Sequence, residues 1–274
     1  MERLTTPAGI TLTYDRSGGG PPLVLVHGAF SDHHTNWEFV KPILQERFTL
    51  YAIARRGRGG TDATVGHRLE DEVADVVAVI EAVREPVFLL GHSYGAHCAL
   101  AAAALVPERI RKLVLYEPAW PTFISSLLMT RLDTLAASQD WDLFAVRFFH
   151  DGLFVPIQEL DALRATNLWP SIVADAPASL HDIRGLVRYD FKPERYRSLA
   201  VPVLLQTGSE SPGDLYVTDA LAAVLPHARI GILQGQAHEG MTTAPEMYAS
   251  AVSAFLLGSE EPLEVASSAS AAAG

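Results

Sequence analysis

Residues 86–105 read PVFLLGHSYGAHCALAAAAL: an apolar run, a pentapeptide that begins and ends with glycine, and a stretch of small residues. The apolar run predicts a buried strand, and the small residues predict a helix. Gly91 and Gly95 have no Cβ atom, so the backbone can reverse closely around Ser93. In a chain with 20 glycines the G-x-S-x-G pattern can occur by chance, so by itself it is weak evidence for a nucleophile. Its place between a strand and a helix makes Ser93 a candidate nucleophile.

The composition is that of a compact globular protein, with 274 residues of which 49% are hydrophobic and 19% charged. A net charge of -11 argues against nucleic acid and against an anionic membrane surface as partners. Residues 1–7 contain no apolar targeting segment and no stretch approaches the length of a membrane span, so we expect a cytoplasmic protein. The single cysteine, Cys98, cannot form an intramolecular disulfide, and we expect a buried, unreactive thiol.

Short apolar runs alternate with amphipathic segments along most of the chain. The runs predict strands at 10–15, 23–26, 48–53, 87–90, 112–116, 201–206 and 229–233. The segments that predict helices are 37–46, 69–83, 96–105, 219–225 and 245–257. Strands that alternate with helices in this way indicate an α/β fold with a mostly parallel, doubly wound sheet.

The alternation stops between residues 119 and 198. Helix-like segments rich in large aromatic residues take over, interrupted by Pro121, Pro156, Pro170 and Pro177. We therefore expect a helical cap (lid) at 119–198, inserted into a core made of residues 1–118 and 199–260. Residues 261–274 form a Ser/Ala-rich, low-complexity tail that we expect to be disordered.

Two further segments extend the pattern around Ser93. HGAF, residues 27–30, follows the strand predicted at 23–26, and LQGQAH, residues 233–238, follows the last predicted strand. Together with GHSYG at 91–95, these segments resemble the α/β-hydrolase superfamily over nearly the whole ordered length of the chain. The resemblance implies the α/β-hydrolase fold, with the cap inserted after the sixth strand.

The same resemblance implies roles for single residues. His238 would be the general base, because the family places its catalytic histidine after the last strand, and after the nucleophile in chain order. One oxyanion-hole amide would come from Tyr94, the residue after the nucleophile. The other would come from Ala29 or, alternatively, from Phe30.

The triad acid departs from the family pattern. Most relatives have an aspartate three residues after the glycine that ends the strand corresponding to 201–206, and here that position is Ser211. Three carboxylates are alternatives: Glu117 at the end of the preceding strand, Glu210 and Asp214. We prefer Glu117, because haloalkane dehalogenases and zearalenone-type lactonases of the superfamily carry a glutamate there. Its longer side chain can also reach the same imidazole nitrogen from the neighbouring strand end.

Other conspicuous residues have structural explanations. The turn RRGRGGT at 55–61 resembles the family's D-x-R-G-x-G-x-S turn, with Ala54 and Thr61 as departures, and its arginines are expected to anchor the turn and not to bind phosphate. His27 would brace its loop, and His92 and His97 would pack or line the pocket. The adjacent side chains of Asp32-His33-His34 diverge without a third ligand cluster, so we expect no metal site.

The expected function is that of a serine hydrolase, which cleaves a carboxylic ester or lactone through an acyl-enzyme at Ser93 and needs no cofactor. Cap aromatics that face Ser93 favour a small, uncharged, partly apolar substrate. A C–C bond hydrolase and a cofactor-free perhydrolase with the same triad are alternatives. A ligand-binding or interaction protein that lost its acid and kept the fold is another. We expect a monomer or a homodimer.

Overall fold

The computed structural model describes residues 1–64 and 66–258, and the tail expected at 261–274 lies outside them. An eight-stranded sheet has the order β1-β2-β4-β3-β5-β6-β7-β8. The strands are β1 (Glu2–Thr5), β2 (Thr11–Gly18), β3 (Pro22–Val26), β4 (Thr49–Ala54), β5 (Val87–His92), β6 (Ile110–Tyr116), β7 (Val203–Gly208) and β8 (Ala228–Leu233). β2 is antiparallel to β1 and β4, and the other neighbours are parallel. The predicted α/β fold with a mostly parallel sheet is confirmed.

Two elements near the N-terminus differ from the prediction. The sequence does not predict β1, because most of its residues are exposed and show no apolar alternation. The helix predicted at 37–46 is a 3-10 turn (Thr35–Trp37) followed by the short helix α1 (Lys41–Leu44). Pro42 lies in the first turn of α1. Because proline has no amide N–H, a longer helix cannot continue through this position without losing a hydrogen bond.

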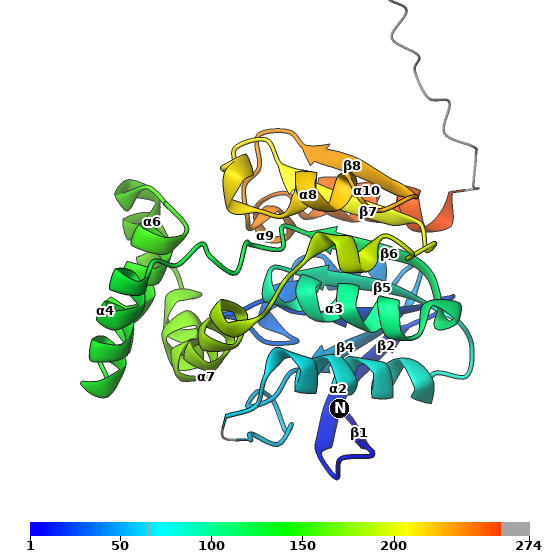
Figure 1. Ribbon diagram of the computed structural model, residues 1–274, viewed down its shortest axis with the longest axis horizontal. Coiled ribbons are helices and arrows are strands. Elements are labelled where there is room, and N and C mark those ends of the chain that lie inside the picture. Colours follow the sequence, from blue (N-terminus) through cyan, green and yellow to red (C-terminus); the bar gives the residue numbers. More distant parts are fainter. Residues whose placement is uncertain (65, 259–274) are drawn as a thin grey trace, which may run out of the picture.

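Helices cover both faces of the sheet (Figure 1). α2 (Leu69–Ala82), α3 (Tyr94–Leu105) and α8 (Thr218–Ala222) pack on one face, and α1 and α10 (Pro245–Leu257) pack on the other. Side chains along β3 alternate between the two cores, with Val24 and Val26 in the first and Leu23 and Leu25 in the second. Because both faces are buried, the central strands are continuous apolar runs in the sequence.

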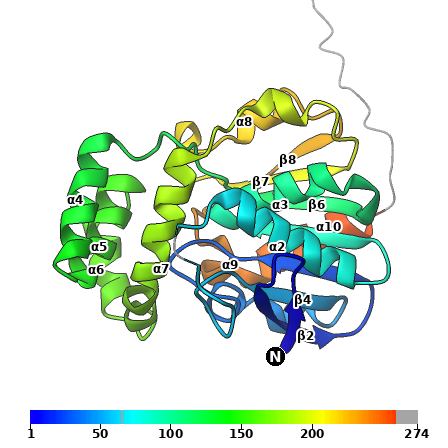
Figure 2. The ribbon, with the colours of Figure 1, turned by 60° about the horizontal axis from the view of Figure 1, so that its bottom comes forward.

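The chain between β6 and β7 is helical. Its elements are α4 (Ser126–Ala137), α5 (Trp141–Arg147), a π-helix (Phe148–Gly152), α6 (Ile157–Arg164) and α7 (Trp169–Arg188). These helices gather at one end of the molecule, beside the sheet (Figures 1 and 2). Phe30, from the turn after β3, packs among their aromatic rings, with ring centroids 4.6 Å from Phe148 and 5.0 Å from Phe149. The division into a core and a cap at the stated residues stays a prediction.

Pro177 does not interrupt a helix, and the prediction is wrong at this position. It lies inside α7, whereas Pro170 stands in the first turn of α7, where proline is well tolerated. Asp175 and Ser179, on either side of Pro177, both bond to Arg58 of the core. Tertiary contacts of this kind offset the cost of the missing amide hydrogen bond.

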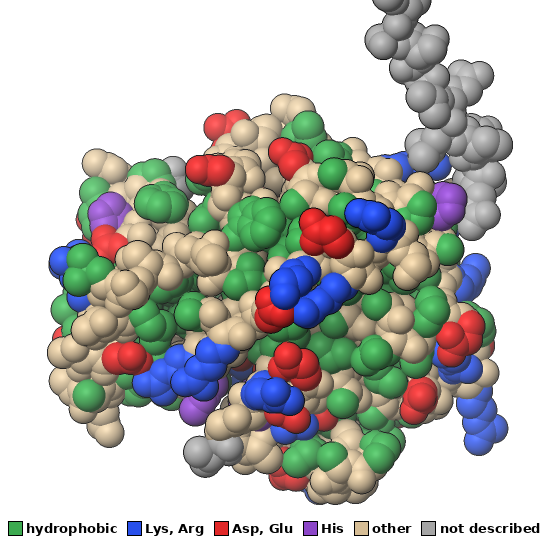
Figure 3. Space-filling view, in the orientation of Figure 1, with side chains coloured by type: hydrophobic (Ala, Val, Ile, Leu, Met, Phe, Trp, Pro, Cys, Tyr) green, Lys and Arg blue, Asp and Glu red, His purple; other side chains and the backbone are tan. Residues whose placement is uncertain are grey.

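The surface mixes charges of both signs. On the face drawn in Figure 3, basic and acidic side chains lie among each other with apolar side chains between them. Among the residues that the structure describes, no helix combines the length and the apolar character needed to cross a membrane. The short helix α9 (Gly240–Thr243) lies directly before α10 in the chain.

Candidate active site

Ser93 occupies the sharp turn between β5 and α3. Its backbone has φ 53° and ψ -120°, a conformation that residues with a side chain rarely adopt. Its amide donates to the carbonyl oxygen of Tyr116 on β6 at 2.8 Å. The neighbouring side chains of His92 and Tyr94 are buried, whereas Ser93 is half-buried. The turn therefore leaves the serine accessible between two buried residues.

Close packing of α3 on the sheet explains the two glycines of the turn. A Cβ atom on Gly91 would lie 2.5 Å from the carbonyl oxygen of Gly95 and 2.6 Å from Cα of Ala96. A Cβ atom on Gly95 would overlap the carbonyl oxygens of Val26 and His27. Both positions thus have the steric requirement for glycine that the sequence predicts.

Glu117 and His238 meet at the carboxyl end of β6. The Nδ1–H of His238 donates to Oε2 of Glu117 at 2.8 Å. The other carboxylate oxygen, Oε1, accepts from the hydroxyl of Thr207 at 2.9 Å and from the amide of Gly208 at 2.7 Å. Glu117 is fully buried, and both of its carboxylate oxygens accept hydrogen bonds from groups of the protein. Within the described chain, Nε2 of His238 makes no hydrogen bond.

The contact between these two groups shifts the pKa of both. Burial lowers the pKa of His238, but the hydrogen bond and the charge of Glu117 raise it more, so that it lies above the ordinary 6.5. Burial raises the pKa of Glu117, and the hydrogen bond and charge of His238 outweigh that effect, so that it lies below the ordinary value. At neutral pH the carboxylate is ionised beside the imidazole.

The alternative acids lie elsewhere. Asp214 is exposed in a 3-10 turn (Gly213–Leu215). Glu210 is also exposed and accepts from the hydroxyl of Ser209 at 3.0 Å. The structure brings Glu117 to the imidazole of His238 and leaves Asp214 and Glu210 away from it.

The loop that carries His238 is fixed against β7 and β5. Gly208, at the end of β7, has no room for a side chain, because a Cβ atom there would overlap the carbonyl oxygen of Gln236. The carbonyl oxygen of His238 lies 3.2 Å from Nε2 of His92, the residue before Ser93. The rings of His92 and His238 are in contact, with centroids 4.7 Å apart. His238 therefore lies at the strand end that carries Ser93.

The backbone amides considered for the oxyanion hole differ in whether they already donate a hydrogen bond. The amide of Phe30 donates to the hydroxyl of Ser179 at 2.6 Å, so it is already engaged. Over residues 1–64 and 66–258, the amides of Ala29 and Tyr94 donate no hydrogen bond. Tyr94 is the first residue of α3, where an amide has no partner within the helix. Of the two residues considered beside Tyr94, the geometry favours Ala29 over Phe30.

Strained backbone concentrates at this site. In the described chain, the non-glycine residues with positive φ are Phe30, Ser93, Glu117, Gln139 and Phe154. The first three lie at the carboxyl ends of β3, β5 and β6. Such conformations are costly and persist where the surrounding structure imposes them, which happens often at functional sites.

The other histidines named from the sequence have structural contacts. The Nδ1–H of His27 donates to the carbonyl oxygen of Gly28 at 2.8 Å, and its Nε2 accepts from the amide of Arg55 at 3.3 Å. Burial lowers the pKa of His27 well below the ordinary value, so the ring is neutral and braces its loop. The Nε2–H of His97 donates to the carbonyl oxygen of Ala119 at 2.7 Å, and burial lowers the pKa of His97 to about 4.

Asp32 closes a local turn. Its carboxylate accepts from the amides of His34 and Thr35, each at 2.8 Å. A different group, made of Asp15, His33 and His34, has polar atoms within 4.8 Å of one another. There Oδ2 of Asp15 already lies 3.2 Å from the ammonium group of Lys41, which supplies its counter-charge.

A family comparison agrees with the strand order and the turn geometry. The profile of the alpha/beta hydrolase family matches residues 23–251, a range that contains Ser93, Glu117 and His238. The chain belongs to the α/β-hydrolase family. The predicted α/β-hydrolase fold and the predicted family membership are thus confirmed. The eight-stranded, mostly parallel sheet described above agrees with this family.

Two sequence relatives of this α/β hydrolase are named as a hydrolase and an esterase. It is 30% identical over 263 residues to 2-(acetamidomethylene)succinate hydrolase of Mesorhizobium japonicum, over 90% of this chain and 92% of that protein. It is 34% identical over 195 residues to pimeloyl-(acyl-carrier protein) methyl ester esterase of Methylococcus capsulatus, over 65% of this chain and 74% of that protein.

Solved structures share the whole fold. An α/β hydrolase from Sphaerobacter thermophilus has a TM-score of 0.79 at 30% identity and covers 93% of this chain and 99% of its own. The enol-lactonase of Burkholderia xenovorans has a TM-score of 0.78 at 19% identity and covers 93% of this chain and 100% of its own. The second likeness is one of fold.

Some residues at the site of this α/β hydrolase carry no signal in the sequence. Thr207 donates to Glu117, and it becomes visible as a candidate once the strand end next to β6 is known. Ser179 accepts from the amide of Phe30, 149 residues earlier in the chain, and no motif marks it.

Proposed function

We propose that this α/β hydrolase is a serine hydrolase that cleaves carboxylic esters or lactones through an acyl-enzyme on Ser93. The observation that carries the proposal is the 2.8 Å hydrogen bond from Nδ1–H of His238 to Glu117. This bond holds the imidazole proton on Nδ1 and leaves Nε2 free to act as a base. Nucleophile, acid and base would then come from the segments that follow β5, β6 and β8.

The proposed reaction has two displacement steps. The hydroxyl oxygen of Ser93 forms a bond to the substrate carbonyl carbon while Nε2 of His238 takes its proton. The amides of Ala29 and Tyr94 bind the negative oxygen, and Glu117 stabilises the imidazolium. The tetrahedral intermediate expels the alcohol, which takes the proton from His238. Water then attacks the acyl-enzyme with His238 as the base, which releases the acid and restores Ser93.

We infer a small, uncharged substrate with an apolar part. Phe30, which follows the proposed oxyanion donor Ala29, packs with Phe148 and Phe149 of the cap. Phe144 and Trp169 extend the same apolar cluster. An apolar cluster beside the proposed oxyanion donor favours a substrate with an apolar acyl or alcohol group. The methyl ester esterase among the sequence relatives supports an ester as the scissile group.

The test of the nucleophile is a panel of p-nitrophenyl esters of increasing acyl length. We expect turnover by the wild type and a loss of roughly 10⁵-fold in kcat in Ser93→Ala, as for other serine nucleophiles. Ser138→Ala is the control, because the hydroxyl of Ser138 bonds to carbonyl oxygens of its own helix. Equal rates for Ser93→Ala and the wild type would exclude Ser93 as the nucleophile.

A covalent label tests the acyl-enzyme independently of the substrate chosen. A fluorophosphonate should modify the peptide that contains Ser93, as detected by mass spectrometry, and should leave Ser93→Ala unmodified. A wild-type protein that neither reacts with the probe nor hydrolyses any ester would instead support a binding protein with a hydrolase fold.

C–C bond hydrolysis is a second candidate. Over 121 residues, 42% of this chain and 43% of the relative, the chain is 34% identical to 2-hydroxymuconate semialdehyde hydrolase of a Pseudomonas species. Consumption of a coloured dienoic ring-cleavage product, followed by its absorbance, together with negligible ester turnover would favour this reaction over ester cleavage.

A further inference from the structure

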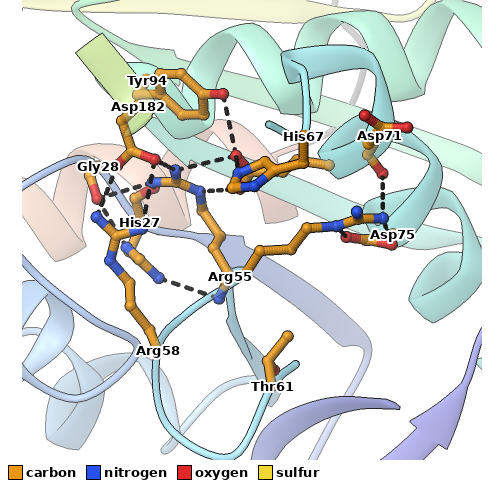
Figure 4. A network of polar contacts seen from close by, with 12 residues as sticks. His27, Gly28, Arg55, Arg58, Thr61, His67, Asp71, Asp75, Tyr94 and Asp182 are labelled. Atoms are coloured by element: carbon orange, nitrogen blue, oxygen red, sulfur yellow. Dashed lines mark hydrogen bonds and ion pairs between the residues drawn. The ribbon is translucent and has the colours of Figure 1, made fainter. Parts of the chain in front are cut away.

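A buried network of charges connects the cap to the turn after β3 (Figure 4). Four side chains define it: Arg55 and Arg58 of the turn after β4, Glu72 of α2 and Asp182 of α7. None of them is more than 4% exposed. We call these four residues the clamp. Charges at this depth are costly to bury unless each is paired and hydrogen-bonded, so the arrangement of the clamp is tightly specified.

Asp182 joins the cap to the core through both arginines. Its Oδ1 accepts from Nη2 of Arg55 at 2.5 Å, and its Oδ2 accepts from Nη2 of Arg58 at 2.7 Å. Arg55 also donates through Nε to Oε2 of Glu72 at 2.8 Å. One carboxylate of α7 therefore fixes the position of the Arg55 guanidinium, and α2 supplies a second anchor.

Arg55 reaches the peptide that carries the amide of Ala29. Its Nη1 donates to the carbonyl oxygen of Gly28 at 3.0 Å and to that of His27 at 3.2 Å. The carbonyl of Gly28 and the N–H of Ala29 belong to one planar trans peptide, so they point in opposite directions. Arg55 is thus the charged donor on the carbonyl of Gly28, beside the neutral donor Nδ1–H of His27, and it contributes to the direction and the polarisation of the Ala29 N–H.

The clamp also holds the side chain of Tyr94, the second proposed oxyanion donor. The hydroxyl of Tyr94 donates to Oε1 of Glu72 at 3.0 Å. The guanidinium of Arg55 lies 4.2 Å from the centroid of the Tyr94 ring, a cation–π contact. Both residues whose amides are proposed to bind the oxyanion are thus tied to the same buried group.

We propose that Arg55 and Asp182 are positioning residues for the oxyanion hole. Asp182 holds Arg55, and Arg55 holds the peptide between Gly28 and Ala29 and the ring of Tyr94, the two residues whose amides would bind a tetrahedral oxyanion. The inference rests on the proposed serine-hydrolase function. It gives α7 a part in the oxyanion hole, because the position of Asp182 on α7 sets the position of Arg55.

A neighbouring ion pair provides a matched control. Arg56, of the same turn, donates to the carboxylate of Asp75 on α2 through Nε at 2.6 Å and through Nη2 at 3.0 Å. Both side chains are buried. The other bonds of Arg56 go to Thr64 and to the carbonyl oxygen of Asp71, away from the cap. Asp75→Asn therefore removes a comparable buried charge without touching the proposed path.

The experiment compares Asp182→Asn with Asp75→Asn. Each variant is assayed for kcat and KM with a p-nitrophenyl ester, and for inhibition by an aliphatic trifluoromethyl ketone, whose adduct with serine mimics the tetrahedral oxyanion. We expect Asp182→Asn to lower kcat and weaken the inhibitor by about tenfold or more, with KM changed less than about twofold. Asp75→Asn should leave kcat and inhibition within about twofold of the wild type.

The melting temperature and the far-ultraviolet circular dichroism of both variants establish that they fold. If the two variants have the same kcat and the same inhibition constant, or if inhibition is unchanged while kcat falls, the inference is wrong. If Asp182→Asn does not fold, Asp182→Glu replaces it, since it keeps the buried charge and displaces the carboxylate that Arg55 contacts. We expect that variant to bind the inhibitor severalfold more weakly, and an unchanged affinity overturns the inference.

Ser93→Ala separates the two proposals. Full turnover by Ser93→Ala overturns the serine-hydrolase function and the positioning role with it. An inactive Ser93→Ala, beside Asp182→Asn and Asp75→Asn variants that behave alike, overturns the positioning role alone.

Discussion

Glu117 lies one strand away from the loop in which the family usually carries its triad acid. Ser211 stands at the usual position. β6 and β7 are adjacent parallel strands with Tyr116 paired to Gln206, so the residues that follow them lie side by side. The amide of Gly208 donates to Glu117 from that neighbouring strand. The end of β7 thus donates hydrogen bonds to the carboxylate of Glu117, which itself follows β6.

Glu117→Gln should abolish most activity by changing the imidazole tautomer. The side-chain oxygen must stay with the donors Thr207 and Gly208, so the new NH₂ group would face Nδ1 of His238. Nδ1 then has to accept, and the proton moves to Nε2, where the base is needed. We expect kcat to fall by about 10³- to 10⁴-fold with little loss of fold, as in other tautomer-disrupting variants. Asp214→Asn is the control, and a larger loss there would contradict the assignment.

Glu117 should also determine the pH at which activity is lost on the acid side of the pH–rate profile. His238 must be neutral to act as a base, and its pKa lies above 6.5, chiefly because Glu117 opposes the effect of burial. We expect kcat/KM of the wild type to rise with pH with a midpoint above 6.5. In Glu117→Gln the imidazolium loses its counter-charge, so the midpoint of the residual activity should move to lower pH. A midpoint that moves upward would argue against the pairing.

At the scale of elements, the sharp turn at Ser93 depends on how closely α3 approaches β3. That approach is set by Gly95, whose missing side chain leaves room for the carbonyl oxygens of Val26 and His27. His27 begins the turn that carries Ala29, so the same contact aligns Ser93 and the turn after β3. A local change in this contact should therefore affect stability and the site together.

Gly95→Ala should destabilise the protein by about 3 kcal/mol or more, because backbone atoms of β3 cannot yield as a flexible side chain can. The measurement is the free energy of unfolding in urea, with the yield of folded protein as a second readout. Gly19→Ala is the matched control, since a Cβ atom on Gly19 meets nothing within 4 Å. It should stay within about 0.5 kcal/mol of the wild type, and equal losses in both variants would refute the steric argument.

At the scale of the whole molecule, buried ion pairs join parts that are distant in the chain. Arg55 and Asp182 are 127 residues apart and form a contact between the turn after β4 and α7. Glu72 of α2 shares the same arginine. Burial raises the pKa of Glu72, but the charge of Arg55 and the hydrogen bond from His67 outweigh it, so its pKa lies well below the ordinary 4.5.

The stabilisation by Glu72 should therefore depend on pH. Because its pKa is lower in the folded chain, the ion pair contributes fully above pH 4.5 and loses its contribution as the pH falls through the folded-state pKa. We expect Glu72→Gln to cost about 3–5 kcal/mol near neutral pH, and this difference from the wild type should shrink below pH 4.5. Urea unfolding at a series of pH values measures it. A difference that grows in acid would contradict the depressed pKa.

The sequence by itself determined the features whose signals are local. Alternating apolar runs marked the strands because each central strand is buried on both faces. Gly91 and Gly95 marked the sharp turn at Ser93, because the missing Cβ atoms are a property of the residues themselves. His27 and His238 each follow a predicted strand, and the structure places each of them after the carboxyl end of that strand. Pro177 showed the limit of such local signals, because α7 continues through it.

The tertiary structure alone decided which residues meet. Three carboxylates were compatible with the sequence, and adjacency of β6 and β7 brought Glu117 to His238, 121 residues away. Ser179 accepts from the amide of Phe30, one of the two candidates after β3 for the oxyanion hole, so the geometry favours Ala29. Asp182 was invisible in the sequence, because its contact with Arg55 depends on where α7 lies over the core. Contacts between distant segments leave no periodic or turn signal, since they are set by the packing of whole elements.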